Sequence, residues 1–466
     1  MEQQARGVTE HIERVLALVA PLPVLSLGVE DALGAVVAED LYATVSVPPF
    51  AGAAMDGYAV RLADLPADGT PVTLRVAGDV AAGPGDPDRL GPGQAVRIMT
   101  GAPLPPGADA VVPVEHTSTG RFVAGAPRAE ESVTLARRPR PHVRAAGEDV
   151  QEGELLARAG TEVTAALVGA LAASGTVRVP VRRRPVVAVI STGAELVPVG
   201  GSLGPGQITD SNGPMLAAAA CAAGADVVRL GPVPDDPGAL QEALDAAVRG
   251  AVLPDAAGAL RNKAADALRN DAAVRGAVPH DAWSSGAAAG DAPCPGRDRH
   301  DGVGVDLVVT AGGVSAGSAD VVREVLAAPS GGGVTDVDVA AVAMSPGRPQ
   351  ALARWRGVPW LALPGNPVGA YASFELFARP AIDRLRGLGP TGTGLGAHRS
   401  LRAAAPWSSP AGRLQVVPVR VTDGGVGPTG SHHSLSALAT ADGLALVPPD
   451  VEKVRAGDAV RVLMLR

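Results

Sequence analysis

Three stretches of the sequence place small and polar residues directly after an apolar run, an arrangement that often serves ligand binding. The stretch "VVAVISTGAELVP" puts Ser191, Thr192 and Glu195 past its run, and "LALPGNPVGAYASFELF" puts Gly365 and Asn366 past another. The third, "DLVVTAGGVSAGSADVV", continues into a glycine pair and small polar residues. Ligands of open α/β sheets bind outside the carboxyl ends of the strands, so these loops predict one shared site.

The third loop has the composition of a phosphate-binding loop. Gly312 and Gly313 permit close backbone approach, and Ser318 is a candidate N-cap for a helix whose free N–H groups would favour an anion. Glu195 and Asp320 would repel that anion unless a divalent cation lay between them, and Mg²⁺ prefers carboxylate oxygens together with substrate phosphate. Composition and spacing therefore predict a magnesium–phosphate site. The alternatives are a packing turn at the glycine pair and a helix-capping role for Glu195.

The elements around these loops predict an α/β domain over residues 181–385. The apolar runs within "RRPVVAVIST", "GADVVRLGPVPDD", "VDLVVTAGG" and "VPWLALPGNP" are each followed by loop residues and most by a helical pattern. Strands that alternate with helices indicate a parallel sheet covered on both faces. Short alternating runs from 48 to 140 predict an all-β lobe, and those from about 390 onward predict a C-terminal one. Helical patterns cover residues 8–20 and 161–175.

Length and charge narrow the class of protein. With 466 residues the chain is too long for one core, and about two to four domains are expected. The formal net charge of −8 argues against a nucleic-acid or membrane-surface protein, because both usually need an excess of Lys and Arg. No apolar run approaches the length of a membrane span. We expect a soluble, cytoplasmic protein.

One segment interrupts the predicted α/β domain. Residues 245–252 recur letter for letter at 271–278, and the stretch from about 250 to 304 is rich in Ala, Gly, Asp and Pro. We interpret this stretch as a duplicated, low-complexity insertion, because loops this long inside a domain are usually disordered or functional.

Taken together, the motifs resemble those of the molybdopterin molybdenumtransferase family, which includes bacterial MoeA and the C-terminal domain of animal gephyrin. They occur in family order and cover nearly the whole chain except the insertion and the extreme C-terminus. The matching stretches are "PPFAGAAMDGYAV", "RIMTGAPLPPGADAVV", "VRAAGEDV", "VAVISTGAEL", "GQITDSNGPML", "GPVPDDP", "DLVVTAGGVSAGSADVV", "SPGRP" and "LPGNPVGAYASFELF".

The resemblance implies a multidomain fold of the α/β plus β class. Its parts would be a parallel-sheet α/β molybdopterin-binding domain, an all-β second lobe and a C-terminal β-barrel lobe. Such chains have four domains, here expected at 22–47 with 141–180 (domain I), 48–140 (domain II), 1–21 with 181–385 (domain III) and 386–466 (domain IV). The family forms an elongated homodimer, whose active site lies between the α/β domain of one subunit and the β lobe of the other.

The resemblance also implies an activity. Such enzymes bind adenylylated molybdopterin, hydrolyse its phosphoanhydride with release of AMP, and insert molybdenum from molybdate into the dithiolene. Mg²⁺ or another divalent ion supports the hydrolysis, and the adenylyltransferase of the same pathway is a candidate partner. Tungsten instead of molybdenum remains open.

Site residues follow from the same motifs. The catalytic positions would be Asp56, Thr100, Glu195, Asp235 and Asp320. Of these, Glu195, Asp235 and Asp320 would hold the metal and the substrate phosphates. The substrate-binding positions would be Gly312, Gly313, Ser315, Gly317, Ser318, Arg348, Pro364 and Asn366.

The sequence departs from the family pattern at its basic residues. Two lysine positions of the family are occupied by Ala341 and Ser345, and Arg348 stands where a third lysine is common. Arg348 can still hold an oxyanion with its planar fork of donors. Two rival functions stay open: the adenylyltransferase of the pathway, which resembles the α/β domain alone, and a scaffold paralogue without catalysis.

Overall fold

The structure is a computed structural model that describes residues 5–122, 130–250, 304–314, 320–328, 333–389, 398–430 and 434–465. The chain divides into two compact units. The larger comprises Met1–Leu25, Gly34–Ala38 and Arg182–Arg466, and the smaller comprises Ser26–Leu33 and Glu39–Val181. The segment predicted as an insertion, from about 250 to 304, falls outside the described residues apart from its two ends.

Four parallel strands make up two thirds of the six-stranded central sheet of the larger unit. They are β16 (Asp226–Val233), β13 (Val186–Thr192), β17 (Leu307–Ala311) and β21 (Val358–Leu363), adjacent in that order. Each neighbouring pair is parallel. These strands are the four apolar runs that the sequence predicts, so the parallel arrangement is confirmed for this part of the sheet.

Two further strands extend the sheet beyond β21, and they are antiparallel. They are β20 (Pro349–Trp355) and β18 (Val334–Ala341). The sheet is therefore mixed, and the prediction of a parallel sheet is wrong for this part. Only Arg356 and Gly357 separate β20 from β21, and both have positive φ, 47° and 87°. A two-residue turn of that kind joins antiparallel neighbours, whereas a parallel pair needs a long crossover.

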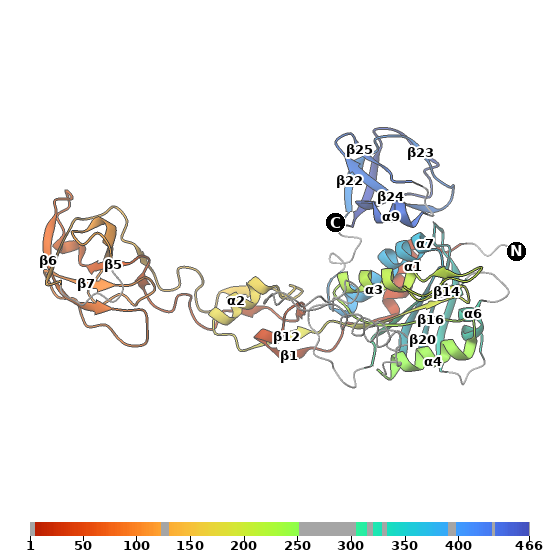
Figure 1. Cartoon of the computed structure of the whole chain (residues 1–466), viewed down its shortest axis with the longest axis horizontal. Coiled ribbons are helices and arrows are strands. Elements are labelled where there is room, and N and C mark those ends of the chain that lie inside the picture. Colours follow the sequence, from red (N-terminus) through yellow and green to blue (C-terminus); the bar gives the residue numbers. More distant parts are fainter. Residues whose placement is uncertain are drawn as a thin grey trace, which may run out of the picture. The chain divides into compact units, whose positions relative to one another are not determined.

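Helices cover both faces of the sheet, as predicted (Figure 1). Val187 and Val189 of β13 pack toward one set of helices, and Ala188 and Ile190 pack toward the other. The first set is α1 (Val8–Leu18), α3 (Asn212–Ala222), α7 (Pro367–Ser373), the π-helical turn η5 (Phe374–Ala378) and α8 (Arg379–Leu385). The second set is α4 (Pro237–Val248) and α6 (Val321–Leu326). Alternation along the strand thus builds two cores, one on each face.

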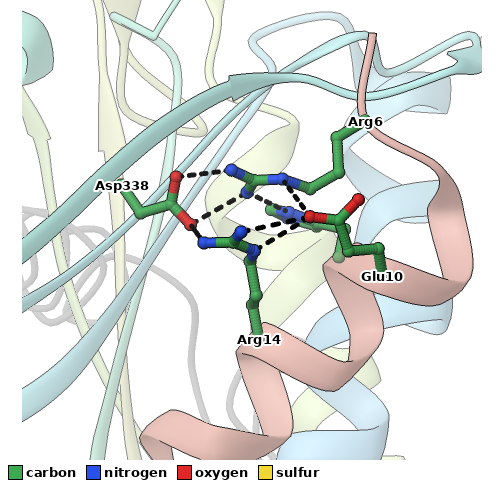
Figure 2. A network of polar contacts seen from close by, with 5 residues as sticks. Arg6, Glu10, Arg14 and Asp338 are labelled. Atoms are coloured by element: carbon green, nitrogen blue, oxygen red, sulfur yellow. Dashed lines mark hydrogen bonds and ion pairs between the residues drawn. The ribbon is translucent and has the colours of Figure 1, made fainter.

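An ionic network fastens the N-terminal helix to strand β18 (Figure 2). Arg6 donates two hydrogen bonds to Asp338, at 2.7 and 2.9 Å, and Arg14 contacts the same carboxylate at 3.3 Å. Glu10 lies 3.1 Å from Arg14. Behind the network, burial lowers the pKa of His11 to about 4, so its ring is neutral at physiological pH.

Asp338→Asn should lower the free energy of unfolding by about 1–3 kcal/mol at pH 7, because it removes the charge that both arginines contact. Burial alone would raise the pKa of Asp338, but the hydrogen bonds and charge of Arg6 outweigh it and hold that pKa below its usual value. A carboxyl with a lowered folded-state pKa stabilises above its unfolded pKa and loses that contribution as the pH falls.

Denaturant unfolding across a pH series measures this difference. The difference in the free energy of unfolding between wild type and Asp338→Asn should be largest at pH 7 and should decrease as the pH drops below about 4. Asp450→Asn, at an exposed turn, serves as the control and should change little. A gap of constant size down to pH 3 would show that the charge of Asp338 contributes nothing.

The C-terminal part of the larger unit is a second β structure. Its strands pair in the order β19–β24–β26–β28–β22, with β25 beside β24 and a separate pair β23–β27. The predicted β-rich C-terminus is confirmed, but these pairings follow an open path and do not show a closed barrel. The elements are β19 (Met344–Ser345), β22 (His398–Arg402), β23 (Trp407–Ser408), β24 (Leu414–Thr422), β25 (Gly425–Pro428), α9 (Leu435–Ala439), β26 (Gly443–Val447), β27 (Lys453–Val454) and β28 (Ala459–Met464).

The smaller unit is built around a five-stranded sheet in the order β8–β5–β7–β6–β9. Its strands are β5 (Gly57–Val60), β6 (Val72–Val80), β7 (Gln94–Ile98), β8 (Ala110–Pro113) and β9 (Ser132–Leu135). This confirms the predicted β lobe. The unit also holds the pairs β3 (Leu41–Tyr42) with β11 (Leu155–Ala157) and β4 (Gly52–Ala53) with β10 (Val143–Arg144), and helix α2 (Ala165–Ala173).

The segments that connect the two units carry three short strands, β1 (Leu25–Gly28), β2 (Val36–Val37) and β12 (Arg178–Arg182). Across the residues that the structure describes, no helix combines the length and apolarity that a membrane crossing requires.

Candidate functional site

A pocket of about 390 Å³ lies at the carboxyl ends of the parallel strands of the larger unit. The loops that line it follow β13, β16, β17 and β21, as expected for an open α/β sheet. Seven of the residues that the sequence predicts for the site line this pocket. They are Glu195, Asp235, Gly312, Gly313, Asp320, Pro364 and Asn366.

Backbone hydrogen bonds bring the two acidic loops of the pocket together. The N–H of Ala194, in the loop after β13, donates to Asp235 Oδ2 at 3.0 Å, and the N–H of Gly193 donates to the carbonyl of Val233 at 3.0 Å. A Cβ at Gly193 would lie 2.6 Å from Glu195 Oε2, so glycine leaves room for that carboxylate. The loops after β13 and β16 thereby place Glu195 and Asp235 on one pocket.

The glycine pair after β17 approaches strand β13 more closely than any side chain allows. Gly312 has φ +106°, and a Cβ there would lie 2.4 Å from the carbonyl oxygen of Thr192. Gly313 has φ +61°. Both conformations favour glycine, and the close approach makes glycine a requirement at position 312. The N–H of Gly312 also donates to the Leu363 carbonyl at 3.2 Å, which ties the loop to the end of β21.

Asn366 has a structural task at the edge of the pocket. Its Oδ1 accepts hydrogen bonds from the N–H groups of Val368 and Gly369, at 3.1 and 3.2 Å, and so caps α7. Pro364 and Gly365 precede it in the lining. The loop after β21 is therefore fixed by the helix start that follows it.

Sequence reasoning assigned no role to Asp210 and Asn212, within "GQITDSNGPML". Asp210 is buried and accepts hydrogen bonds from the Ser191 hydroxyl at 2.8 Å and the Gly213 N–H at 3.0 Å. Asn212 lines the pocket and donates to the carbonyl of Gly365 at 2.7 Å. The polar run "TDSN" between two apolar stretches was the available signal, but only the tertiary contacts show what each residue does.

The electrostatic character of the pocket is acidic. The lining residues that the structure describes include the carboxylates of Glu195, Asp235 and Asp320, and neither lysine nor arginine. Arg348 is exposed in the connection between β19 and β20, and its neighbour Pro349 lines the pocket in its place. The structure therefore does not bring the predicted oxyanion-binding Arg348 into the lining.

The three carboxylates share the pocket without forming a ready-made metal cage. Among the described residues, no three His, Cys, Asp or Glu side chains lie close enough together to hold an ion. Mg²⁺ usually takes only one or two protein carboxylates and completes its octahedral shell with water and substrate phosphate. The donor chemistry of the lining fits that mode of binding.

Three predicted residues, Ser315, Gly317 and Ser318, lie outside the described residues. Asp56 and Thr100 belong to the smaller unit, where they contact each other. The Thr100 N–H and hydroxyl both donate to Asp56 Oδ1, at 2.7 and 2.8 Å. These bonds, the backbone one first, hold the pKa of Asp56 below its usual value against a small opposing effect of burial.

Thr100→Val should raise the pKa of Asp56 part of the way back toward its ordinary value near 4. The hydroxyl bond is lost while the backbone N–H, the larger cause, remains. An NMR titration of the Asp56 carboxyl measures the shift. Thr73→Val, elsewhere in the same unit, is the control and should leave that pKa unchanged; an equal pKa in all three proteins would contradict the assignment.

The fold and the pocket place the chain among multidomain α/β proteins that bind a small ligand at the carboxyl edge of a sheet. It is 37% identical to "Molybdopterin molybdenumtransferase 2" of Mycobacterium tuberculosis, over 98% of this chain and 99% of that protein. It is 32% identical to the molybdopterin molybdenumtransferase of Bacillus subtilis, over 94% of this chain and 89% of that protein. The chain belongs to the molybdopterin molybdenumtransferase (MoeA) family, and it is accordingly a transferase of molybdenum cofactor biosynthesis.

Domain models and a solved structure agree with that assignment. Residues 6–175 match the MoeA N-terminal region (domain I and II), and residues 400–465 match the MoeA C-terminal region (domain IV). Residues 188–256 and 298–384 match the probable molybdopterin binding domain, with an interruption inside the predicted insertion. The molybdopterin biosynthesis MoeA protein of Pyrococcus horikoshii superimposes with a TM-score of 0.69 at 28% identity, covering 99% of this chain and 100% of that one.

Proposed function

We propose that the chain binds adenylylated molybdopterin, hydrolyses its phosphoanhydride with release of AMP, and transfers molybdenum from molybdate to the dithiolene. The observation that carries this proposal is the composition of the pocket, in which a glycine-lined edge meets the carboxylates Glu195, Asp235 and Asp320 without a lining Lys or Arg. A polyanionic substrate in such a pocket needs a cation to screen it.

Mg²⁺ is the cation that the donor set favours. Carboxylates drawn from Glu195, Asp235 and Asp320 would hold this ion beside the substrate phosphates. When bound, a divalent ion neutralises the oxygens of the anhydride and of the leaving phosphate. Asp320 is half-buried at the start of α6 and lines the pocket, so its carboxylate is placed to serve as a ligand.

The remaining work falls to the backbone and to positioning. Gly312 lies close to β13 and has no side chain, so a phosphate could approach the backbone of this loop directly. Asn366 fixes the neighbouring loop, which follows β21, through the cap of α7. Hydrolysis then adds water across the anhydride, and the fold contributes orientation more than covalent chemistry, as is general for phosphoryl transfer. We propose that Ser315, Gly317 and Ser318 continue the phosphate-binding loop. We also propose that Arg348, which is exposed beside the lining residue Pro349, contacts molybdate or phosphate from outside the described lining.

The finer organisation is proposed from the family resemblance. We place domains at 22–47 with 141–180, 48–140, 1–21 with 181–385 and 386–466, and we propose a cytoplasmic homodimer. Asp56 and Thr100 of one subunit would then complete the pocket of the other, and the adenylyltransferase of the pathway would supply the substrate. Molybdate is substrate here, and Mg²⁺ is the resident ion.

One comparison of substrates separates this function from that of the adenylyltransferase. Purified protein is given either molybdopterin with ATP or adenylylated molybdopterin with molybdate. We expect no ATP consumption in the first reaction and AMP release in the second. ATP consumption with transfer of the adenylyl group to molybdopterin would overturn the proposal.

A further inference from the structure

Two side chains of the pocket hold buried polar atoms that receive no hydrogen bond from the residues that the structure describes. Asn212 is 7% exposed and Thr192 is 4% exposed, and both line the pocket. Within the part of the chain that the structure describes, Asn212 Oδ1 and Thr192 Oγ1 have no hydrogen-bond partner. A native structure rarely leaves such atoms unpaired, because a buried polar atom without a partner has lost its hydrogen bonds to water and has gained no hydrogen bond in the protein.

The orientation of the Asn212 amide is fixed by chemistry. Its Nδ2 donates to the carbonyl oxygen of Gly365 at 2.7 Å, and two carbonyl oxygens could not pair there. The atom that remains is therefore Oδ1, which can only accept. Asp210 holds this arrangement, since it binds the Ser191 hydroxyl and the N–H of Gly213, the residue after Asn212.

The second atom belongs to the same wall of the pocket. Gly365, which receives the Asn212 amide, lies against Gly312, since a Cβ on Gly365 would be 3.4 Å from the Gly312 Cα. Gly312 in turn lies against Thr192, whose Oγ1 would be 2.7 Å from a Cβ at position 312. Asn212, which is bonded to Gly365, and Thr192, which packs against Gly312, are therefore connected through the contact between these two glycines.

We propose that Asn212, assisted by Thr192, binds the N–H edge of the heterocycle in the substrate and so determines specificity; this rests on the proposed function. An acceptor-only oxygen repels a phosphate, which presents only acceptors at neutral pH, and it attracts an amino group or a ring N–H. A substrate of adenylylated-molybdopterin type offers that chemistry twice, on its aminopyrimidinone ring and on its adenine. The phosphates are left to the glycine loop and the cation.

Binding of two separate probes tests the proposal and distinguishes the pterin ring from the adenine ring. Molybdopterin carries the pterin without adenine, and AMP carries the adenine without the pterin. Calorimetry with wild type, Asn212→Ala and Thr192→Val gives the affinity for each. We expect Asn212→Ala to weaken one of the probes about tenfold or more and Thr192→Val to weaken the same probe by a smaller factor. The probe whose affinity falls shows whether Asn212 binds the pterin ring or the adenine ring.

Thr335→Val is the matched control, because Thr335 is an exposed residue of β18 in the same sheet and is not one of the described residues that line the pocket. It should bind both probes as wild type does. Equal affinities for wild type and both variants would overturn the inference while leaving the proposed function intact. Equal weakening of both probes together with a lower melting temperature would also overturn it, since that pattern reports a structural effect. Wild type that binds neither probe would overturn the proposed function itself.

Thr192→Val keeps the shape of the side chain and removes a hydroxyl that has no hydrogen-bond partner among the described residues, so this variant should keep its fold even if Asn212→Ala does not. In that case its probe affinities decide the question alone. Weakening confined to one probe supports the inference, and unchanged affinity for both overturns it.

Discussion

Gly312→Ala should abolish ligand binding and reduce AMP release at least a hundredfold. The added Cβ would lie 2.7 Å from the hydroxyl of Thr192 and 2.4 Å from its backbone carbonyl oxygen, which cannot move without displacing the end of β13. The backbone at Gly312 also has φ +106°, which an L side chain rarely adopts. We expect a loss of about 3 kcal/mol of stability from strain and overpacking together.

Denaturant unfolding measures the loss of stability, and calorimetry with adenylylated molybdopterin measures the loss of binding. Gly427→Ala is the control: a Cβ there meets nothing within 4 Å, and the residue lies in the same unit. It should change neither stability nor binding appreciably. If Gly312→Ala bound the ligand like wild type, the glycine loop would not form the wall of the substrate site.

Asp320→Asn should lower AMP release by about 10²–10⁴-fold while binding of the pterin nucleotide stays largely intact. The substitution preserves the size of the side chain and removes the negative charge that we assign to the divalent ion. The side chain lines the pocket and does not cap α6, so the helix start should survive the change.

A single-turnover assay with adenylylated molybdopterin, molybdate and Mg²⁺ measures the rate of AMP release, and Tm verifies the fold of the variant. Asp423→Asn, at the exposed turn after β24, is the charge-matched control and should turn over like wild type. An unchanged rate of AMP release in Asp320→Asn would show that Asp320 does not hold the divalent ion.

Much of the α/β architecture could be predicted because it depends on local pattern. Each parallel strand is a short apolar run bounded by loop residues, and a strand buried on both faces has that sequence. The carboxyl ends of such strands meet at one edge, so Glu195 and Asp320 could be expected on one pocket although they lie 125 positions apart, whereas Asp235 was expected there only from the family resemblance.

Other features depend on contacts that no local pattern reports. The antiparallel strands β18 and β20 follow from the turn at Arg356 and Gly357, whose positive φ values the letters "RG" indicate only weakly. Arg348 was expected on the substrate from its motif, yet its side chain is exposed outside the described lining. The Asn212 amide is oriented by a bond to Gly365, 153 residues further along the chain, and this leaves an oxygen with no partner in the described part of the chain.

The most direct measurement is AMP release from adenylylated molybdopterin by wild-type protein, with Mg²⁺ and molybdate varied independently. If acidic side chains at the edge of the sheet recruit a divalent ion that opens the phosphoanhydride, chelation should stop AMP release at every molybdate concentration and added Mg²⁺ should restore it. An equal rate of AMP release with and without a chelator would contradict the account.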